Sequence, residues 1–153
     1  MKLTKEIYEK YLKNWEIAVR YLDADEIELA KEDEKILVLT LARRANSKID
    51  IIIDEIETIL LPSEEISVIH ELRAFSNKDI EWLLELYRLA SYYSRAIKYG
   101  LYFKDIDYLK QTINELLEFY KEKEPQLREL FARKRDIWKE PINKSQYDFR
   151  YFL

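Results

Sequence analysis

The sequence predicts an all-α protein: a helical bundle of five to seven helices with a short C-terminal tail. Apolar residues recur at intervals of three or four along almost the whole chain, which is the period of an amphipathic helix. The 153 residues include one glycine and three prolines, too few for the tight turns of a sheet protein. Because 48% of the residues are hydrophobic, the chain can bury a core. We expect one bundle over residues 1–140 and a tail over residues 141–153.

Two helices are expected at residues 4–22 and 34–60. The first has an apolar stripe of Ile7, Tyr11, Trp15, Ala18 and Leu22, and the second has one of Val38, Leu41, Ala45, Ile49, Ile52, Ile56 and Ile59. The second begins with KILVLTLA, which also has the composition of a buried strand, but its stripe continues into the helix that follows. Residues 23–34 hold seven acidic residues against one lysine and should form a short helix or an exposed connection.

Capping residues mark the next two helices. In the stretch LPSEE, Ser63 can cap the N-terminus of a short helix. Ser76 and Asp79 have the spacing of a capping box and should open a further helix. Gly100 would end that helix, because glycine adopts the left-handed conformation of a helix C-terminus without a steric penalty.

The last helices are expected on either side of Pro125. Residues 105–122 form an amphipathic pattern with Ile106, Leu109, Ile113, Leu116 and Tyr120 on one face. Proline fits the first turn of a helix better than its interior, so Pro125 should begin a new helix. That helix should end near residue 140, before Pro141.

Composition excludes several classes of protein. The chain has no cysteine, and therefore no disulfide and no thiolate metal site. The segment MKLTKEIYEK lacks the apolar core of a signal peptide, and the longest apolar runs, ILVL and III, are too short to span a membrane. We expect a cytoplasmic protein. Abundant Lys, Glu and Ile, with few Asn, Gln and Met, suggest a thermophilic source.

The charge distribution argues against strong nucleic-acid binding. The net charge is −4, and only the last 33 residues, 121–153, carry more basic than acidic side chains, nine against six. Within them the motif ARKRDIWKE holds Arg133, Lys134, Arg135 and Lys139 beside Trp138. These four cations are candidate phosphate contacts. The ordinary exposed face of a terminal helix is the favoured interpretation, and we expect direct binding to be weak or absent.

No catalytic motif is visible. His70 is the only histidine, so the chain cannot supply the paired Glu-x-x-His motifs of a di-metal bundle, and no arginine has the spacing used by helical nucleases. A single glycine rules out a glycine-rich phosphate loop. We expect no enzyme activity, cofactor or metal, and we expect His70 to be a helix-surface or hydrogen-bonded polar residue.

Three acids share one face of the helix at 34–60. Asp50, Asp54 and Glu57 have helical spacing and are able to bind a cation or to act as an acid and base pair. A solvent face opposite the isoleucine stripe is the favoured interpretation.

Aromatic residues are concentrated in the helix that begins near residue 80. They are Trp82, Tyr87, Tyr92, Tyr93, Tyr99, Tyr102 and Phe103. Side chains at so many angles around a helix cannot all be buried, and exposed tyrosines are frequent at protein interfaces. We expect a division between core and partner interface. Base stacking is the weaker alternative because few cations accompany these rings.

The tail SQYDFRYFL resembles the PIP box, the peptide by which replication and repair proteins bind the sliding clamp PCNA. Counted from Gln146 as position one, Phe149, Phe152 and Leu153 stand at positions four, seven and eight. The resemblance implies a single 3₁₀ turn that brings these apolar groups together, while the glutamine fills a polar pocket. The chain departs from the pattern at Leu153, where an aromatic residue is usual, and at Phe149, where a smaller one is. Packing of the tail on its own bundle or on another subunit is the favoured interpretation of these residues, and clamp binding is the sharper hypothesis.

A second stretch is similar to the helical domain of the GINS family, the replicative-helicase scaffold. ARRANSKIDII followed by LPSEEISVIHELRAF has the order of the family's basic helix and its PEE-like helix start. Arg43 and Arg44 are one or two places away from the family spacing relative to Lys48. Residues 78–140 also look helical, where the family has a small β domain.

These observations predict a non-enzymatic helical interaction protein. We expect an adaptor or subunit of a DNA replication or repair assembly that docks through Gln146, Phe149, Phe152 and Leu153. Self-association into a homo-oligomer is compatible with this expectation. The alternatives are a viral or other structural or regulatory helical bundle, and the small helical subunit of an RNA-guided complex.

Overall fold

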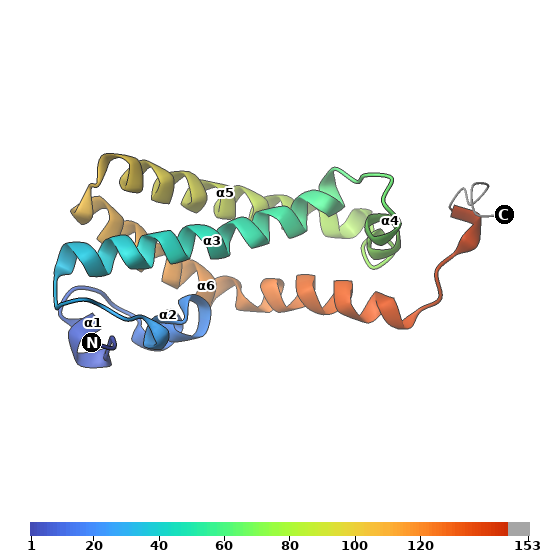
Figure 1. The fold of residues 1–153 in the computed structure, drawn as a ribbon. Coiled ribbons are helices and arrows are strands. Elements are labelled where there is room, and N and C mark those ends of the chain that lie inside the picture. The colour runs from blue at the N-terminus through green and yellow to red at the C-terminus, as the bar shows by residue number, and fades with distance from the viewer. Residues whose placement is uncertain (147–153) are drawn as a thin grey trace.

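The structure is a computed structural model that describes residues 1–146 (Figure 1). It contains six α-helices: α1 (Lys5–Glu9), α2 (Trp15–Leu22), α3 (Glu34–Leu60), α4 (Ile66–Leu72), α5 (Ile80–Phe103) and α6 (Ile106–Asp136). Four 3₁₀ turns accompany them: η1 (Ala24–Glu26) and η2 (Asn77–Asp79) lie between helices, and η3 (Ile137–Lys139) and η4 (Lys144–Gln146) follow α6. The described residues form no strand beyond one bridge between Lys2 and Glu28. The expected all-α helical bundle is confirmed.

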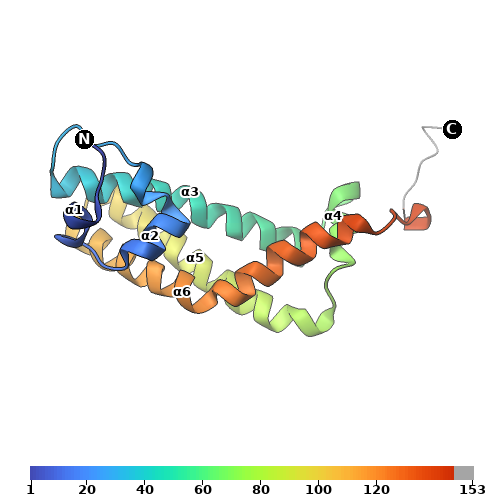
Figure 2. The same ribbon diagram turned by 90° about the horizontal axis from the view of Figure 1, so that it is seen from below.

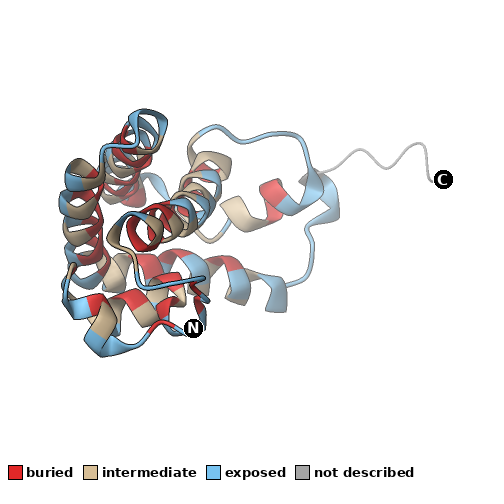
Figure 3. Ribbon diagram, turned by 60° about the vertical axis from the view of Figure 1, so that its left-hand side comes forward, coloured by how far each residue is buried: buried red, intermediate tan, exposed pale blue. Residues whose placement is uncertain are grey.

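Three long helices make the body of the bundle. Helices α3, α5 and α6 lie side by side, and α5 runs antiparallel to the other two (Figures 1 and 2). The predicted stripe of α3 is buried in full, from Val38 to Ile59. Figure 3 shows that the buried stripes of the long helices face one another. Among the described residues, no helix has the length and hydrophobicity that a bilayer-spanning segment requires.

The single helix expected at residues 4–22 is wrong, because the chain breaks between α1 and α2. Asn14 adopts a left-handed conformation with φ of 60°, which asparagine tolerates better than most residues. The Tyr8 hydroxyl donates to the carbonyl of Lys13 at 2.6 Å and the Lys13 amide donates to Asn114 Oδ1 at 3.0 Å. The chain therefore turns between the two short helices, so that α2 packs against α3 and α6 and α1 packs against α2.

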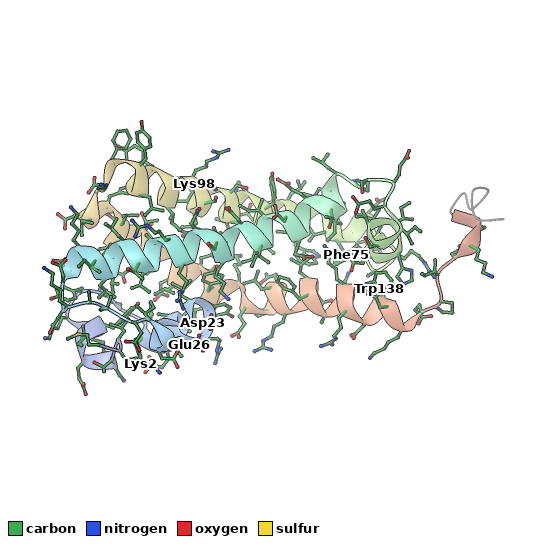
Figure 4. All side chains as sticks on the ribbon, in the orientation of Figure 1. Lys2, Asp23, Glu26, Phe75, Lys98 and Trp138 are labelled. Atoms are coloured by element: carbon green, nitrogen blue, oxygen red, sulfur yellow. The ribbon has the colours of Figure 1, made fainter. Side chains whose placement is uncertain are left out.

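The acidic segment at residues 23–34 is a connection with two kinds of side chain. Ala24, Ile27 and Leu29 are buried, whereas the acids between them are exposed. The Leu3 amide donates to the Ile27 carbonyl at 2.9 Å, so the start of the chain runs beside this segment. We call residues 1–33, which precede α3, the N-terminal layer. Figure 4 shows Lys2, Asp23 and Glu26 in this layer.

Gly100 does not end a helix. Helix α5 continues to Phe103, and Lys104 takes the left-handed conformation with φ of 50°. A Cβ atom on Gly100 would lie 2.5 Å from Leu109 Cδ2 and 2.6 Å from Leu109 Cγ. The glycine is therefore required for the close approach of α5 and α6.

Pro125 does not begin a helix either, because α6 is continuous and contains it. The ring removes one backbone donor and bends a helix at that point. Figure 2 shows that the path of α6 turns in its middle part. Beside the bend, Tyr120 stacks on Tyr21 with ring centroids 4.4 Å apart, and Glu124 pairs with Arg20 at 2.9 Å. Helix α2 thus packs against the bend.

Of the two predicted N-terminal caps, the one at Ser63, before α4, differs from expectation. Ser63 Oγ accepts a hydrogen bond from Glu65 N at 3.4 Å in the loop, and α4 begins only at Ile66. The predicted capping box of Ser76 and Asp79 is confirmed: the Ser76 amide donates to Asp79 Oδ2 at 2.8 Å.

Candidate docking site

Helix α4 holds the end of α6. The His70 ring is fully buried, and its Nε2 donates to the Ile137 carbonyl at 2.8 Å. Its centroid lies 4.6 Å from that of the Trp138 ring, whose Nε1 donates to Glu71 Oε2 at 2.8 Å. The second ring nitrogen of His70, Nδ1, has no hydrogen-bond partner among the described residues. His70 is thus a hydrogen-bonded polar residue as expected, but it lies in the interior.

A third contact from α4 fixes the point where the tail begins. Arg73 Nη1 donates to the carbonyl of Pro141 at 3.0 Å. Beyond it, residues 142–145 are exposed, and their described hydrogen bonds are local, from Ser145 to Asn143 Oδ1. Figures 1 and 4 show the chain leaving the bundle at this end, past the labelled Trp138 and Phe75. We call residues 137–141 and the three side chains that hold them the tail anchor; these side chains are His70 and Glu71 of α4 and its C-cap residue Arg73.

A partly buried ionic network lies near the C-terminal end of α6. The Asp79 carboxylate accepts hydrogen bonds from Trp82 Nε1 at 3.0 Å and Ser76 N at 2.8 Å, and it pairs with Arg133 Nη1 at 2.9 Å. The hydrogen bond from Trp82, followed by those from Ser76 and Arg133, lowers the pKa of Asp79 to about 2. The Arg133 guanidinium also lies 5.4 Å from the centroid of Phe75.

The four cations of the predicted basic motif do not form one patch. Lys134 is buried, and its ammonium donates to the carbonyl of Glu55 at 2.6 Å, to Glu55 Oε2 at 2.7 Å and to Thr58 Oγ1 at 2.7 Å. The expectation that Lys134 contacts phosphate is therefore corrected, because its charge is used to join α6 to the end of α3. Arg133 is likewise engaged with Asp79.

The other two cations of that motif lie at the surface. Arg135 Nε is 2.8 Å from Asp136 Oδ1, and Lys139 Nζ is 3.5 Å from the same oxygen. Both side chains are exposed and both charges have an acidic neighbour. The surface charge of the motif is therefore small.

Most of the predicted docking tail lies outside the described residues. Phe149, Phe152 and Leu153 fall beyond residue 146, and of Gln146 the structure describes only the backbone, as the last residue of η4. The structure thus describes where the tail begins and not how it ends.

The acids of α3 have unequal environments. Asp50 accepts from Ser94 Oγ at 2.9 Å and pairs with Lys98 at 3.2 Å, and Glu57 accepts from the Tyr87 hydroxyl at 2.7 Å. Only Asp54 is fully on the solvent side. Two of the three acids therefore tie α3 to α5. No group of three or more His, Asp or Glu residues among the described residues is arranged to hold a metal ion.

The aromatic residues of α5 divide as expected between core and surface. Trp82, Tyr87 and Tyr93 are half-buried and pack on the core. Tyr92, Tyr99, Tyr102 and Phe103 are exposed, and Tyr102 is 81% exposed. Tyr99 contacts both Phe103 and Tyr108, with centroids 4.9 and 5.1 Å apart. The end of α5 that is remote from the tail anchor thus carries a cluster of exposed rings.

Two cations of α3, Arg44 and Lys48, hold the segment that precedes this helix. Arg44 Nη1 donates to the carbonyl of Asp23 at 3.0 Å, and Lys48 pairs with the Asp23 carboxylate at 3.3 Å.

Comparison of the chain with protein-family models, curated proteins and solved structures gave no match.

The tail anchor itself was not anticipated from the sequence. His70, Glu71 and Arg73 are 67 or 68 residues away from their partners, so no local pattern connects them. The only available signal was a lone histidine in a short helix, which is compatible with many positions.

Proposed function

We propose that this chain is a non-enzymatic, cytoplasmic helical adaptor or subunit of a DNA replication or repair assembly, and that it docks through its tail. The observation that carries the proposal is the tail anchor. Two side chains of α4 and its C-cap residue Arg73 hold residues 137–141, and the described residues that follow are exposed. A tail released from a fixed point is well placed to reach a partner's pocket.

The tail sequence supports a sliding clamp as the partner. Gln146, Phe149, Phe152 and Leu153 have the spacing of the PIP box, and each buried phenylalanine stabilises a complex by roughly 1.5–3 kcal/mol. After the ordering cost of a flexible peptide, two phenylalanines and a leucine are sufficient for a dissociation constant on the order of micromolar. The internal use of Lys134 and Arg133 is consistent with weak or absent direct binding to nucleic acid.

The test compares the full chain with tail variants in binding to a purified sliding clamp by calorimetry. Phe149→Ala with Phe152→Ala should weaken binding at least ~100-fold, since two buried rings are lost. The matched control is Tyr147→Ala with Tyr151→Ala, which removes two aromatic rings outside positions four, seven and eight and should change affinity little.

Deletion of residues 143–153 separates docking from core packing. If the tail is a ligand, the melting temperature should stay within about 2 °C of the full chain while clamp binding disappears. A deleted chain that melts many degrees lower and still binds the clamp contradicts the proposal.

A structural bundle that assembles with copies of itself is the second candidate. The exposed cluster of Tyr99, Tyr102 and Phe103 favours it, because solvent-exposed rings are frequent at interfaces. Light scattering distinguishes the two: a concentration-dependent oligomer that is lost in Tyr102→Ser with Phe103→Ser supports the structural bundle.

A further inference from the structure

A groove between α5 and α6 has an apolar floor. It has a volume of 380 Å³, and Leu89 and Tyr93 of α5 and Phe119 of α6 line it. Tyr93 lies 5.3 Å from Phe119 on one side and 5.3 Å from the exposed Tyr92 on the other, measured between ring centroids. The three rings therefore form a continuous path from the core to solvent, and the volume suits one or two large apolar side chains.

The rim of this groove is acidic. Glu115, Glu118 and Glu122 line it from α6, and Glu85 lines it from α5, against the single cation Lys123. The three α6 acids are spaced i, i+3 and i+7, so they stand on one face over about 10 Å of helix. The negative charge is thus arranged in a row along an apolar floor.

Little of this negative charge is neutralised within the molecule. Glu85 pairs with Arg88 and Glu122 lies 4.0 Å from Lys123. Glu115 accepts from the neutral amide of Gln111 and Glu118 from that of Asn14, and neither has a cationic partner among the described residues. Burial, followed by the negative charge of Glu115, raises the pKa of the Tyr93 phenol.

We propose that the α5–α6 groove is a second docking site, which binds a basic amphipathic helix from a protein partner. An apolar anchor of that helix would fill the space over Leu89 and Phe119. Lysine or arginine side chains one and two turns away would pair with the acid row. Apolar contact supplies affinity, and the row of acids selects cationic partners and fixes their register.

The test uses a synthetic probe with the full chain. The probe is a fluorescein-labelled 15-residue helix of leucine and lysine with one tryptophan on its apolar face, and a second probe has glutamate in place of every lysine. Fluorescence anisotropy should show binding of the basic probe only. Glu115→Lys with Glu122→Lys should weaken that binding at least ~10-fold, because attraction becomes repulsion.

The matched control is Asp25→Lys with Glu26→Lys, which makes the same change in net charge at two exposed acids in the N-terminal layer. Binding by this variant should stay within ~2-fold of the unchanged chain. Equal losses in both double variants would overturn the proposal, because attraction would then depend on net charge alone. Equal binding of the acidic probe would overturn it as well.

A second measurement locates the bound probe. The photoreactive residue p-benzoylphenylalanine at position 92, beside the groove, should form a crosslink to the basic probe, whereas the same residue at position 102 should not. Crosslinking at position 102 alone would place the probe on the aromatic end of α5 and overturn the proposal. Clamp binding through the tail should be unchanged by the groove substitutions, so the two docking sites are tested separately.

Discussion

The carboxylate of Asp79 has a pKa of about 2, against an ordinary value of 3.8, because Trp82, Ser76 and Arg133 all donate to it. A depressed folded-state pKa adds stability above the unfolded-state value and loses it as the pH falls through the folded-state value. The difference corresponds to roughly 2–3 kcal/mol of unfolding free energy. This contribution should be complete above about pH 5 and should decline between about pH 4 and pH 2.

Asp79→Asn therefore has a pH-dependent effect. At pH 7 the variant should lose about 2 kcal/mol of unfolding free energy, because the amide cannot replace the charge beside Arg133. At pH 2 the difference between variant and unchanged chain should become much smaller. Urea titrations at the two pH values measure this, and an equal loss at both would show that shape rather than charge is responsible.

Gly100→Ala should destabilise the protein although alanine is the better helix former. Helix propensity favours alanine by about 1 kcal/mol, but the new Cβ would collide with Leu109, whose fully buried side chain must shift to make room. Overpacking costs typically 1–3 kcal/mol, so we expect a net loss of about 1 kcal/mol. A double-mutant cycle with Leu109→Ala should show a favourable coupling between the two substitutions. Additive losses in that cycle would contradict the steric explanation.

His70→Ala should weaken the tail anchor. The variant loses the hydrogen bond to Ile137 and the contact with Trp138, and we expect a cost of about 2 kcal/mol. The Glu140 amide, which donates to the same Ile137 carbonyl at 3.0 Å, should exchange its hydrogen faster. Ser67→Ala is the control, since this exposed residue of the same helix takes no part in the anchor and its substitution should change the unfolding free energy by about 0.5 kcal/mol or less. If the Glu140 amide exchanges its hydrogen at the same rate in His70→Ala, the His70 side chain does not help to hold the tail anchor.

Among the helices, α3 was the most predictable because one pattern dictates all of it. Its stripe keeps a spacing of three and four over the whole helix, and its bounds agree with expectation. The break between α1 and α2 was not predictable, because the stripe keeps its phase across it. The break depends on hydrogen bonds such as the one from Lys13 to Asn114, 101 residues away.

Pro125 and Gly100 were misinterpreted for a shared physical reason. Local preferences place proline at a helix start and glycine at a helix end. In α6, the packing of α2 against the bend compensates for the backbone hydrogen bond that Pro125 cannot make. In α5, Gly100 has no side chain, and the close approach of α6 requires this. Tertiary contacts decided both elements, and a single sequence does not display them.

Pro125→Ala tests this account of α6. Alanine restores a backbone donor inside the helix, and the exposed site leaves room for it. Because the contacts of Tyr21 and Arg20 remain, we expect the unfolding free energy to rise by about 1–2 kcal/mol, less than the full cost of an interior proline. Gln126→Ala should be nearly neutral. A lower stability of Pro125→Ala in urea would show that the proline itself is needed for the bend.

At the scale of the whole molecule, the tail anchor and the exposed aromatic rings lie at opposite ends of the bundle. Helix α6 has 31 residues and a contour length of about 46 Å. The tail anchor lies at its C-terminal end, while the exposed rings of Tyr99, Tyr102 and Phe103 lie beside its N-terminal end (Figure 1). Partners at the two ends would not touch each other, and the α5–α6 groove lies between them.

Because residues near α1 and α2 contact residues of α6 that are far away in sequence, the helices should pack in a defined order during synthesis. Asn14 bonds Glu118 and Arg20 bonds Glu124, each across 104 residues, so α1 and α2 leave the ribosome well before their partners in α6 exist. By contrast, only residues 104 and 105 separate α5 from α6, and so short a loop closes at little entropic cost. The α5–α6 hairpin should therefore become protected first in pulsed hydrogen exchange, and α1 and α2 last. Until then the nascent chain exposes the apolar side chains of its first layer, and a chaperone has that interval in which to bind them.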